Sequence, residues 1–235
     1  MQIVLLPFAG GSSFSYNVLR DHLRHQWRDI NLLMLESPGR GRRMREPLLR
    51  RFDRIVMDMV DQMDGKLEEG FTLFGHSMGA LLAREAAHEL KRRSMPMPAH
   101  IVCTGSEAPC YLPKGRDYHT RSREELIEVL RGFGGSQSDV LAHPELMQLL
   151  EPVFRADFEA VETYRYVERP PLDIPLTVII GSEEDIAPEE AAAWDRESTL
   201  MRPVIKFPGG HFFLFDHAYF FVNHLIISAQ THGTA

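Results

Sequence analysis

One short stretch constrains the fold of this chain more than any other. Residues 71–83 read FTLFGHSMGALLA: a bulky apolar run, the pentapeptide GHSMG, and then a small, apolar, helix-forming segment. A strand that turns sharply into a helix, with a serine at the turn, has this pattern. Glycines flank the serine because such a turn leaves no room for neighbouring side chains. We therefore predict that Ser77 is a nucleophile, with a structural serine in a tight connection as the alternative.

A serine hydroxyl attacks efficiently only when a base removes its proton. Of the eleven histidines, His211 is the best candidate for this base. It follows the strand-like VIKFPGG and precedes an apolar, helical stretch, which predicts a loop at the carboxyl end of a strand. The ligand sites of parallel sheets lie at that edge, so we expect His211 to reach Ser77.

A third group, an acid, should orient the imidazole and stabilise its charged form. The run LTVIIGSEEDIAPEE predicts a buried strand followed by three acids at 183–185. Their position before His211 gives the chain order serine, acid, histidine that is typical of α/β-hydrolases. We predict Asp185 as the acid. Glu184 is the alternative, because counting from the end of the strand favours it in some hydrolases.

Two backbone N–H groups are candidates for an oxyanion hole. Met78 begins the predicted helix after the serine, and helix N-termini stabilise negative charge. The second donor should come from the loop after the first strand, LLPFAGGSS. There Gly10 and Gly11 let the backbone approach a ligand closely. Ala9 is the predicted donor and Phe8 the alternative.

Strand-like and helical segments alternate along the chain. Predicted strands are Ile3–Leu6, Ile30–Leu35, Phe71–Phe74, Ile101–Thr104, Leu176–Ile180 and Val204–Phe207. Predicted helices include Phe14–His25, Phe52–Met63, Met78–Arg93, Arg123–Arg131, Pro144–Tyr166 and a final helix that begins after His211. This alternation predicts an α/β fold with a mostly parallel sheet flanked by helices.

One region interrupts the alternation. Residues 115–168 contain helical patterns but no convincing strand. We expect residues 1–114 and 169–235 to form the sheet-containing core. The inserted segment is either a long crossover or a helical lid over a pocket, with the glycines near 132–135 as joints.

Composition narrows the functional class. The chain has 235 residues, 44% of them hydrophobic, a net charge of -7 and two cysteines. No apolar run is long enough to cross a bilayer, and the N-terminus lacks the features of a signal peptide. We expect a cytoplasmic monomer that binds neither membrane nor nucleic acid. Its chemistry requires no metal and no cofactor.

Positive charge is concentrated near the N-terminus. Residues 1–54 hold ten arginines against five acids, and the densest cluster contains Arg40, Arg42, Arg43 and Arg45. A solvated basic loop explains such a cluster. The alternative is a docking patch for an acidic partner or a phosphate.

Seven stretches together resemble the type II, stand-alone thioesterases of nonribosomal peptide and polyketide biosynthesis. They are LLPFAGGS, SPGRGRRMREP, LFGHSMGALLA, GSEAP, ELMQLLEPVFRADFEAVETY, GSEEDIAPEEAAAW and FPGGHFFL. The PGR and RADFEAVETY segments make the match specific, because general α/β-hydrolases need neither. The similarity covers nearly the whole chain. Two departures are Ser106-Glu107, where relatives often have basic residues, and an acid loop without the common Asp-Pro.

The resemblance implies an α/β-hydrolase fold and hydrolysis of acyl or aminoacyl thioesters on the phosphopantetheine arm of carrier proteins. Pantetheine then arrives with the substrate and is no cofactor of the enzyme. The same resemblance assigns the nucleophile to Ser77, the base to His211 and the acid to Asp185, with Met78 and Ala9 as oxyanion donors. It makes the helical insert a lid over an acyl chamber. We expect this chamber to be lined by Phe8, Phe133, Phe154 and Phe158, with ordinary helix packing as the alternative for the last three. We expect carriers to dock on Arg40, Arg42 and Arg43.

Three other functions remain open at this point. The nearest alternative is a medium-chain acyl-carrier or acyl-CoA thioesterase. Another serine esterase or acyltransferase is the second. A non-catalytic scaffold that binds carriers is the third, and the complete set of candidate catalytic residues argues against it.

Overall fold

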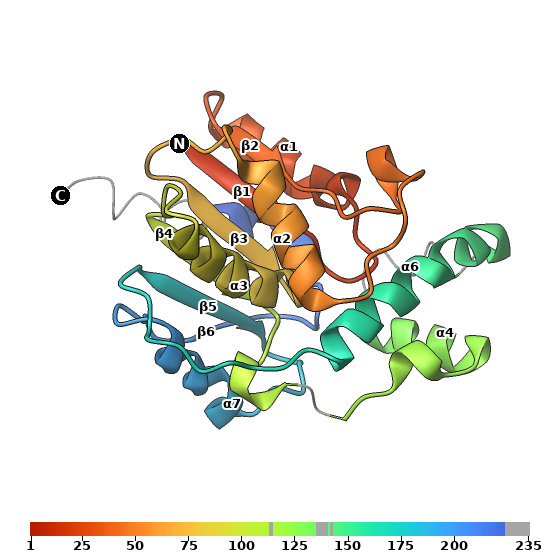
Figure 1. Cartoon of the computed structure of the whole chain (residues 1–235). Helices are drawn as coiled ribbons and strands as arrows, with labels where there is room; N and C mark the ends of the chain where they lie inside the picture. Colours follow the sequence, from red (N-terminus) through yellow and green to blue (C-terminus); the bar gives the residue numbers. More distant parts are fainter. Residues whose placement is uncertain (113–114, 135–140, 142, 224–235) are drawn as a thin grey trace.

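The described residues of this computed structural model are 1–112, 115–134, 141 and 143–223. They form a single sheet with helices on both faces (Figure 1). Its strands are β1 (Gln2–Leu6), β2 (Asn31–Met34), β3 (Thr72–His76), β4 (His100–Thr104), β5 (Leu176–Gly181) and β6 (Ile205–Phe207). They lie in the order β2-β1-β3-β4-β5-β6, and all neighbouring pairs are parallel. The predicted α/β fold with a mostly parallel sheet is confirmed.

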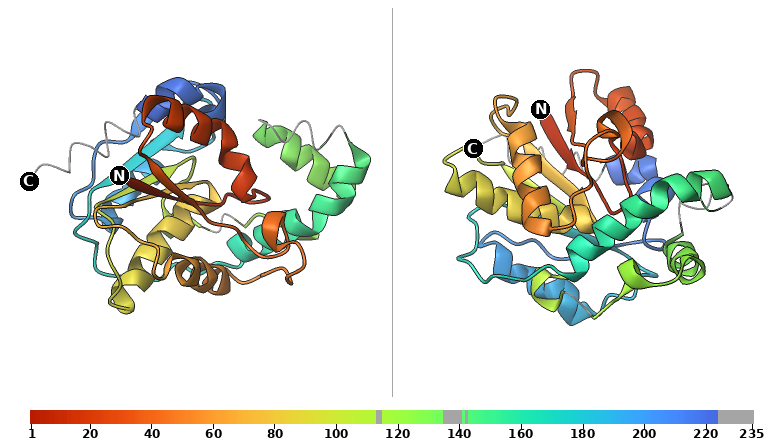
Figure 2. Two further views of the ribbon diagram at one scale, coloured as in Figure 1. Left: turned by 90° about the horizontal axis from the view of Figure 1, so that it is seen from above. Right: turned by 45° about the vertical axis from the view of Figure 1, so that its right-hand side comes forward.

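Helices cover the two faces of this sheet or stand beyond its edge. They are α1 (Asn17–Gln26), α2 (Phe52–Met63), α3 (Met78–Arg92), α4 (Arg123–Phe133), α6 (Pro144–Glu162), α7 (Pro188–Ala192) and α8 (Phe213–Asp216). Short 3₁₀ segments are η1 (Ser13–Tyr16), η2 (Gly41–Arg43), η3 (Pro109–Tyr111), η4 (Tyr118–Thr120) and η5 (Ala193–Glu197). The views in Figure 2 place α2 and α3 on one face and α1 and α8 on the other.

Strand β3 shows how the core divides between the two faces. Successive side chains of a strand point in opposite directions. Leu73 packs with α2 and α3, whereas Phe74 packs with α1 and α8, and both side chains are fully buried. A strand that is buried on both faces reads as a continuous apolar run rather than an alternating one, which is why this stretch was recognisable in the sequence.

Helix α3 lies unusually close to the sheet. Its inward face carries small, fully buried side chains, which are Ala80, Ala83, Ala86 and Ala87. A Cβ on Gly79 would lie only 2.8 Å from the carbonyl oxygen of Leu6. This close packing fixes the N-terminus of α3, and with it Ser77, at the carboxyl edge of β1 and β3.

Between β4 and β5, the described residues form the helices α4 and α6, the 3₁₀ segments η3 and η4 and connecting loops, and no strand of the sheet. Helices α4 and α6 form a separate apolar cluster that contains Leu126, Leu130, Met147, Phe154 and Phe158. Figure 2 shows both helices standing beyond the edge of the sheet. Helix α6 ends at Glu162, earlier than the predicted Tyr166.

Two other predicted helices differ from those observed. The predicted helix Phe14–His25 begins as the 3₁₀ segment η1 and continues as α1. The predicted final helix is interrupted at His217, which follows α8 with φ -120° and ψ 35°. Nothing in the surrounding contacts explains this interruption.

None of the helices in the described ranges combines the length and the apolar character that crossing a bilayer requires.

The close approach of β3 and α3 predicts a strong effect of one added methyl group. In Gly75→Ala, the new Cβ would lie 1.9 Å from the carbonyl oxygen of Gly79. Because backbone cannot yield as a side chain can, we expect a loss of about 3 kcal/mol in the free energy of unfolding, measured in urea. Gly132→Ala is the control, since nothing lies within 4 Å of its Cβ position. A loss below about 1 kcal/mol in Gly75→Ala would contradict the predicted clash.

Candidate active site

Ser77 occupies a strained turn between β3 and α3. Its backbone has φ 55° and ψ -121°, a conformation that costs a non-glycine residue of order 1–3 kcal/mol. The Ser77 N–H donates a 2.8 Å hydrogen bond to the carbonyl oxygen of Thr104 in β4. Gly75 and Gly79 have no space for a Cβ. The sheet and helix together therefore impose a backbone conformation that presents the hydroxyl at the sheet edge.

Four of the residues predicted to take part in catalysis line one small cavity. Ser77, Met78, Ala9 and His211 contribute to a chamber of about 80 Å³. They come from four places in the chain: the loops after β1 and β6, the β3–α3 turn and the start of α3. Parallel strands bring these segments together because their carboxyl ends share one edge.

A carboxylate orients His211. The Nδ1 of His211 lies 2.6 Å from Oε1 of Glu184, whose side chain is 5% exposed. The other carboxylate oxygen, Oε2, accepts a 2.6 Å hydrogen bond from the N–H of Gly181 at the end of β5. Both oxygens are thus engaged, so the carboxylate is fixed in position as well as directed at the imidazole.

The predicted contact between Asp185 and His211 is wrong. The turn after β5 closes with a 3.3 Å hydrogen bond from the Glu184 N–H to the carbonyl oxygen of Gly181. This turn directs Glu184 inward, while Asp185 is exposed and lines only an outer cavity. The alternative that counting from the strand end had favoured, Glu184, is the residue in contact with the imidazole.

A second histidine packs behind the first. The ring centroids of His76 and His211 are 4.7 Å apart, and His76 Nδ1 lies 2.9 Å from the hydroxyl oxygen of Thr104. Burial, together with the nearby His211, lowers the pKa of His76 well below its usual value. His76 therefore stays neutral at neutral pH and presents no competing positive charge to His211.

Both residues predicted to supply oxyanion donors, Ala9 and Met78, line this chamber. Met78 is the first residue of α3, where helix N–H groups have no partner within the helix. Ala9 lies in the turn after β1, which is closed by a 2.9 Å hydrogen bond from Gly11 N–H to the carbonyl oxygen of Phe8. Among the residues described, the structure records no hydrogen bond from the N–H of either Ala9 or Met78.

The four phenylalanines predicted for the chamber divide into two pairs. Phe133 and Phe158 line the cavity beside Ser77, and the ring of Phe133 lies 5.1 Å from that of His211. Phe8 and Phe154 do not line it. Phe8 packs beneath it in the core of the α1 face, and Phe154 covers Gly10 instead.

Polar residues of the chamber wall were missing from the predicted site. Glu107 and Arg116 line the wall and contact each other at 3.4 Å. Glu162 at the end of α6 accepts the N–H of Tyr118 at 2.7 Å. An outer cavity of about 750 Å³ continues from this wall past His211 and Glu184. The sequence offered one indication for Glu107, because this residue departs from the family pattern. It offered none for Arg116 or Glu162.

The three arginines predicted to dock carriers differ in burial and in their partners. Arg40 is buried and paired with Asp157 of α6. Arg43 forms ion pairs with Glu46 and Asp58. Of the three predicted docking residues, only Arg42 is exposed, and its guanidinium lies over the ring of Phe14. A run of arginines in the sequence does not show which of them find acidic partners in the fold.

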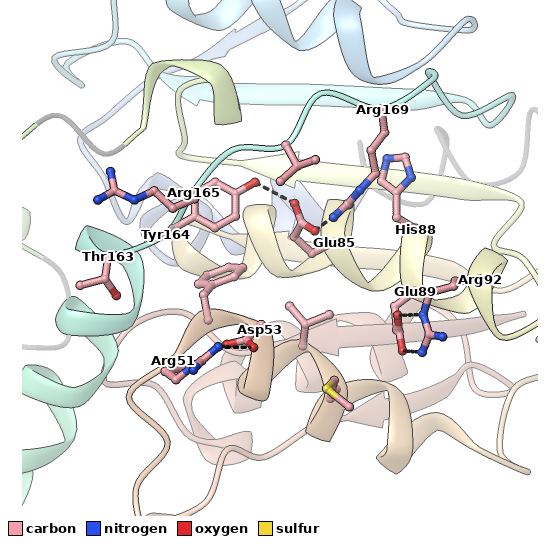
Figure 3. Close-up of a pocket in the computed structure, with 14 residues that line it drawn as sticks. Arg51, Asp53, Glu85, His88, Glu89, Arg92, Thr163, Tyr164, Arg165 and Arg169 are labelled. Atoms are coloured by element: carbon pink, nitrogen blue, oxygen red, sulfur yellow. Dashed lines mark hydrogen bonds and ion pairs between the residues drawn. The ribbon is translucent and has the colours of Figure 1, made fainter.

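A cavity of about 830 Å³ lies elsewhere, in the groove between α2 and α3. Figure 3 shows its rim of paired charges, in which Arg51 faces Asp53, Arg92 faces Glu89, and Arg169 faces Glu85. Arg165 also lines this groove. Ser77 and His211 do not line it.

Within the described residues, no group of three or more His, Cys, Asp or Glu side chains is placed to hold a metal ion.

A model of the thioesterase domain family matches residues 1–228. The chain belongs to this family. It is 30% identical over 218 residues to thioesterase PikA5 of Streptomyces venezuelae, covering 92% of this chain and 76% of that protein. RedJ, a thioesterase from the prodiginine pathway of Streptomyces coelicolor, superposes with a TM-score of 0.85 at 35% identity, covering 97% of this chain and 85% of RedJ. The type II thioesterase BorB from the borrelidin biosynthetic cluster superposes with a TM-score of 0.88 at 30% identity, over 97% of this chain and 92% of BorB.

These relatives confirm the resemblance that the sequence motifs indicated, to type II thioesterases of nonribosomal peptide and polyketide pathways. They also make this thioesterase a member of a family of thioester hydrolases.

The contact between Glu184 and His211 predicts which acid matters for turnover. We expect Glu184→Gln to lower kcat for a small acyl thioester at least about 100-fold, because the amide no longer stabilises the charged imidazole. Asp185→Asn should change kcat less than about threefold. The opposite ranking of the two variants would contradict the assignment of Glu184.

Proposed function

We propose that this thioesterase hydrolyses acyl or aminoacyl thioesters carried on the phosphopantetheine arm of carrier proteins in a nonribosomal peptide or polyketide pathway. Its task there is to remove stalled or incorrect acyl groups or to release a product. The observation that carries the proposal is the chamber lined by Ser77, His211, Met78 and Ala9, with Glu184 in contact with the imidazole.

The proposed reaction begins with Ser77. His211 accepts the hydroxyl proton on Nε2, because the contact of Nδ1 with Glu184 keeps the other proton on Nδ1. The Ser77 oxygen attacks the thioester carbonyl, and the N–H groups of Met78 and Ala9 stabilise the oxyanion. The pantetheine thiol leaves, taking the proton from His211. Water activated by His211 then hydrolyses the acyl-serine and regenerates the enzyme.

Substrate access supports a lid role for the inserted helices. Phe133 from α4 and Phe158 from α6 form part of the chamber wall. The chamber of about 80 Å³ continues into an outer cavity of about 750 Å³, which offers a route for a pantetheine arm. The acyl group then contacts residues of the insert, so the insert contributes to acyl selectivity. The partner is an acyl or peptidyl carrier protein.

The nucleophile is tested by substitution and by covalent labelling. Ser77→Ala should lower hydrolysis at least about 1000-fold, because no other group in the chamber forms the acyl intermediate. The loss is measured as the intact mass of acyl-loaded carrier protein before and after addition of enzyme. Labelling by a fluorophosphonate probe should disappear in the same variant.

Ser106→Ala is the matched control, since Ser106 also lines the chamber and its hydroxyl already donates to the carbonyl oxygen of Glu107. This control should keep the label. If Ser77→Ala retains wild-type turnover, the proposed mechanism is wrong.

A substrate panel separates the proposed function from its alternatives. We expect kcat/KM to be highest for acyl groups on a carrier protein, lower for the same acyl groups on coenzyme A, and lowest for simple oxygen esters. A preference for acyl-CoA or for oxygen esters would favour the other thioesterase and esterase functions. Absence of both turnover and fluorophosphonate labelling would favour a carrier-binding scaffold.

A further inference from the structure

A buried ion pair connects helix α6 to the loop that carries the proposed oxyanion donor. Arg40, in the loop after β2, donates from Nη1 and Nη2 to the two carboxylate oxygens of Asp157 at 2.5 and 2.8 Å. The side chains are 3% and 0% exposed. The two residues are 117 positions apart in the chain, so the pair joins segments that have no local connection.

The same carboxylate also binds the backbone beside Ala9. Asp157 Oδ2 accepts a 2.7 Å hydrogen bond from the N–H of Gly10. Arg40 Nη1 donates to the carbonyl oxygen of Gly11 at 3.3 Å. The loop after β1 is therefore held from one side by the carboxylate and from the other by the guanidinium.

Helix α6 also presses on this loop sterically. Gly10 has φ +75°, and a Cβ there would lie 1.9 Å from Cε1 of Phe154. Phe154 precedes Asp157 by three positions, so both side chains lie on the same face of α6. The loop can contact this face of α6 because Gly10 has no side chain and because Asp157 supplies an acceptor for the Gly10 N–H.

Packing alone does not account for an aspartate at this position. The buried face of α6 is otherwise apolar, with Val153, Ala156 and Ala160 among its members. A buried ion pair is often no more stabilising than well-packed hydrophobic residues of similar volume. A hydrophobic residue cannot, however, accept the hydrogen bond of Gly10, and that hydrogen bond determines the position of the loop.

We propose that Arg40 and Asp157 are positioning residues. They fix the position of the Ala9 N–H, the proposed oxyanion donor, and make this position depend on the packing of α6 against the loop after β1. The proposal rests on the proposed role of the Ala9 N–H. When α6 packs against this loop, Asp157 holds Gly10, and the adjoining Ala9 lines the chamber together with Ser77. When α6 moves away, the loop loses this acceptor and the oxyanion hole loses one donor.

The expected size of the effect follows from known oxyanion holes. Removal of one donor lowers kcat about 10²–10³-fold, and a 1 Å misplacement costs a comparable amount. Substrate binding in the ground state needs neither contact. Loss of the positioning pair should therefore lower kcat and leave KM nearly unchanged.

The test uses the full chain and a small, soluble acyl thioester, so that carrier docking plays no part. In the double variant Arg40→Met/Asp157→Leu, apolar side chains replace the pair and leave no unpaired buried charge. We expect kcat to fall about 100-fold, with KM within about threefold. Affinity for a trifluoromethyl ketone, which forms an oxyanion with Ser77, should fall by a similar factor. Affinity for a non-hydrolysable thioether analogue should not change.

A matched control comes from the neighbouring arginine. Arg43 makes an equivalent two-pronged contact with Asp58 of α2, at 2.6 and 2.8 Å, from the same loop. Neither side chain has a recorded contact with Gly10 or Gly11. The variant Arg43→Met/Asp58→Leu should keep kcat within about threefold of the wild-type value. It measures the general effect on kcat of losing an ion pair in this loop.

A rescue variant separates the hydrogen bond to Gly10 from the ion pair. In Arg40→Met/Asp157→Asn, the amide oxygen again accepts from the Gly10 N–H although the charge is gone. We expect this variant to recover at least about tenfold in kcat over the apolar pair. If the apolar pair does not fold, as judged by its thermal unfolding, the asparagine variant and the Arg43 control still give the comparison of kcat and KM.

The outcomes divide clearly. A fall in kcat and in ketone affinity confined to the Arg40–Asp157 variants, with rescue by asparagine, supports the proposal. Unchanged kcat, equal losses in the Arg43 control, or a change in KM alone overturns it. Failure of the proposed function itself would appear differently, as a wild-type enzyme without thioester turnover or a Ser77→Ala variant that retains it.

Discussion

The whole site depends on one backbone constraint, the turn that holds Ser77 at φ 55° between β3 and α3. A non-glycine residue adopts this conformation only where surrounding structure imposes it. Here the parallel sheet fixes one side of the turn and the alanine-lined helix α3 fixes the other. Gly75 and Gly79 make the approach sterically feasible. Packing of the core therefore offsets the free-energy cost of the Ser77 backbone conformation and keeps the serine in the wall of the chamber.

Around this turn, buried carboxylates fix the positions of loop segments. Glu184 spans the end of β5 and His211, and Asp157 spans Arg40 and Gly10. In each case one carboxylate binds both a cationic or polar side chain and a backbone N–H. Breaking a buried pair by removing one partner typically costs about 3–5 kcal/mol. These contacts consequently define where loops lie with a precision that apolar packing does not give.

Much of the fold was predictable because its signals are local. The strands around 3–6, 71–74 and 176–180 are apolar runs buried on both faces, and helix α2 has the predicted bounds. The turn at GHSMG was predictable because a tight strand-to-helix turn requires glycines on both sides of the serine. The final helix was predicted as continuous but is interrupted at His217. The four chamber phenylalanines divided in two because tertiary packing, not local sequence, decides which side chains of a helix or loop line a cavity.

The sequence by itself determined the sheet and the helix pattern, the strained serine and the histidine after the last strand, since each depends on residues adjacent in the chain. It also placed the chain in its family through the PGR and RADFEAVETY segments. Only the tertiary structure decided that Glu184 rather than Asp185 contacts His211. It likewise decided that Arg40 is buried against Asp157, 117 residues away. The reason is physical: the direction of a side chain and the partner of a charge are set by three-dimensional packing, which sequence spacing does not encode.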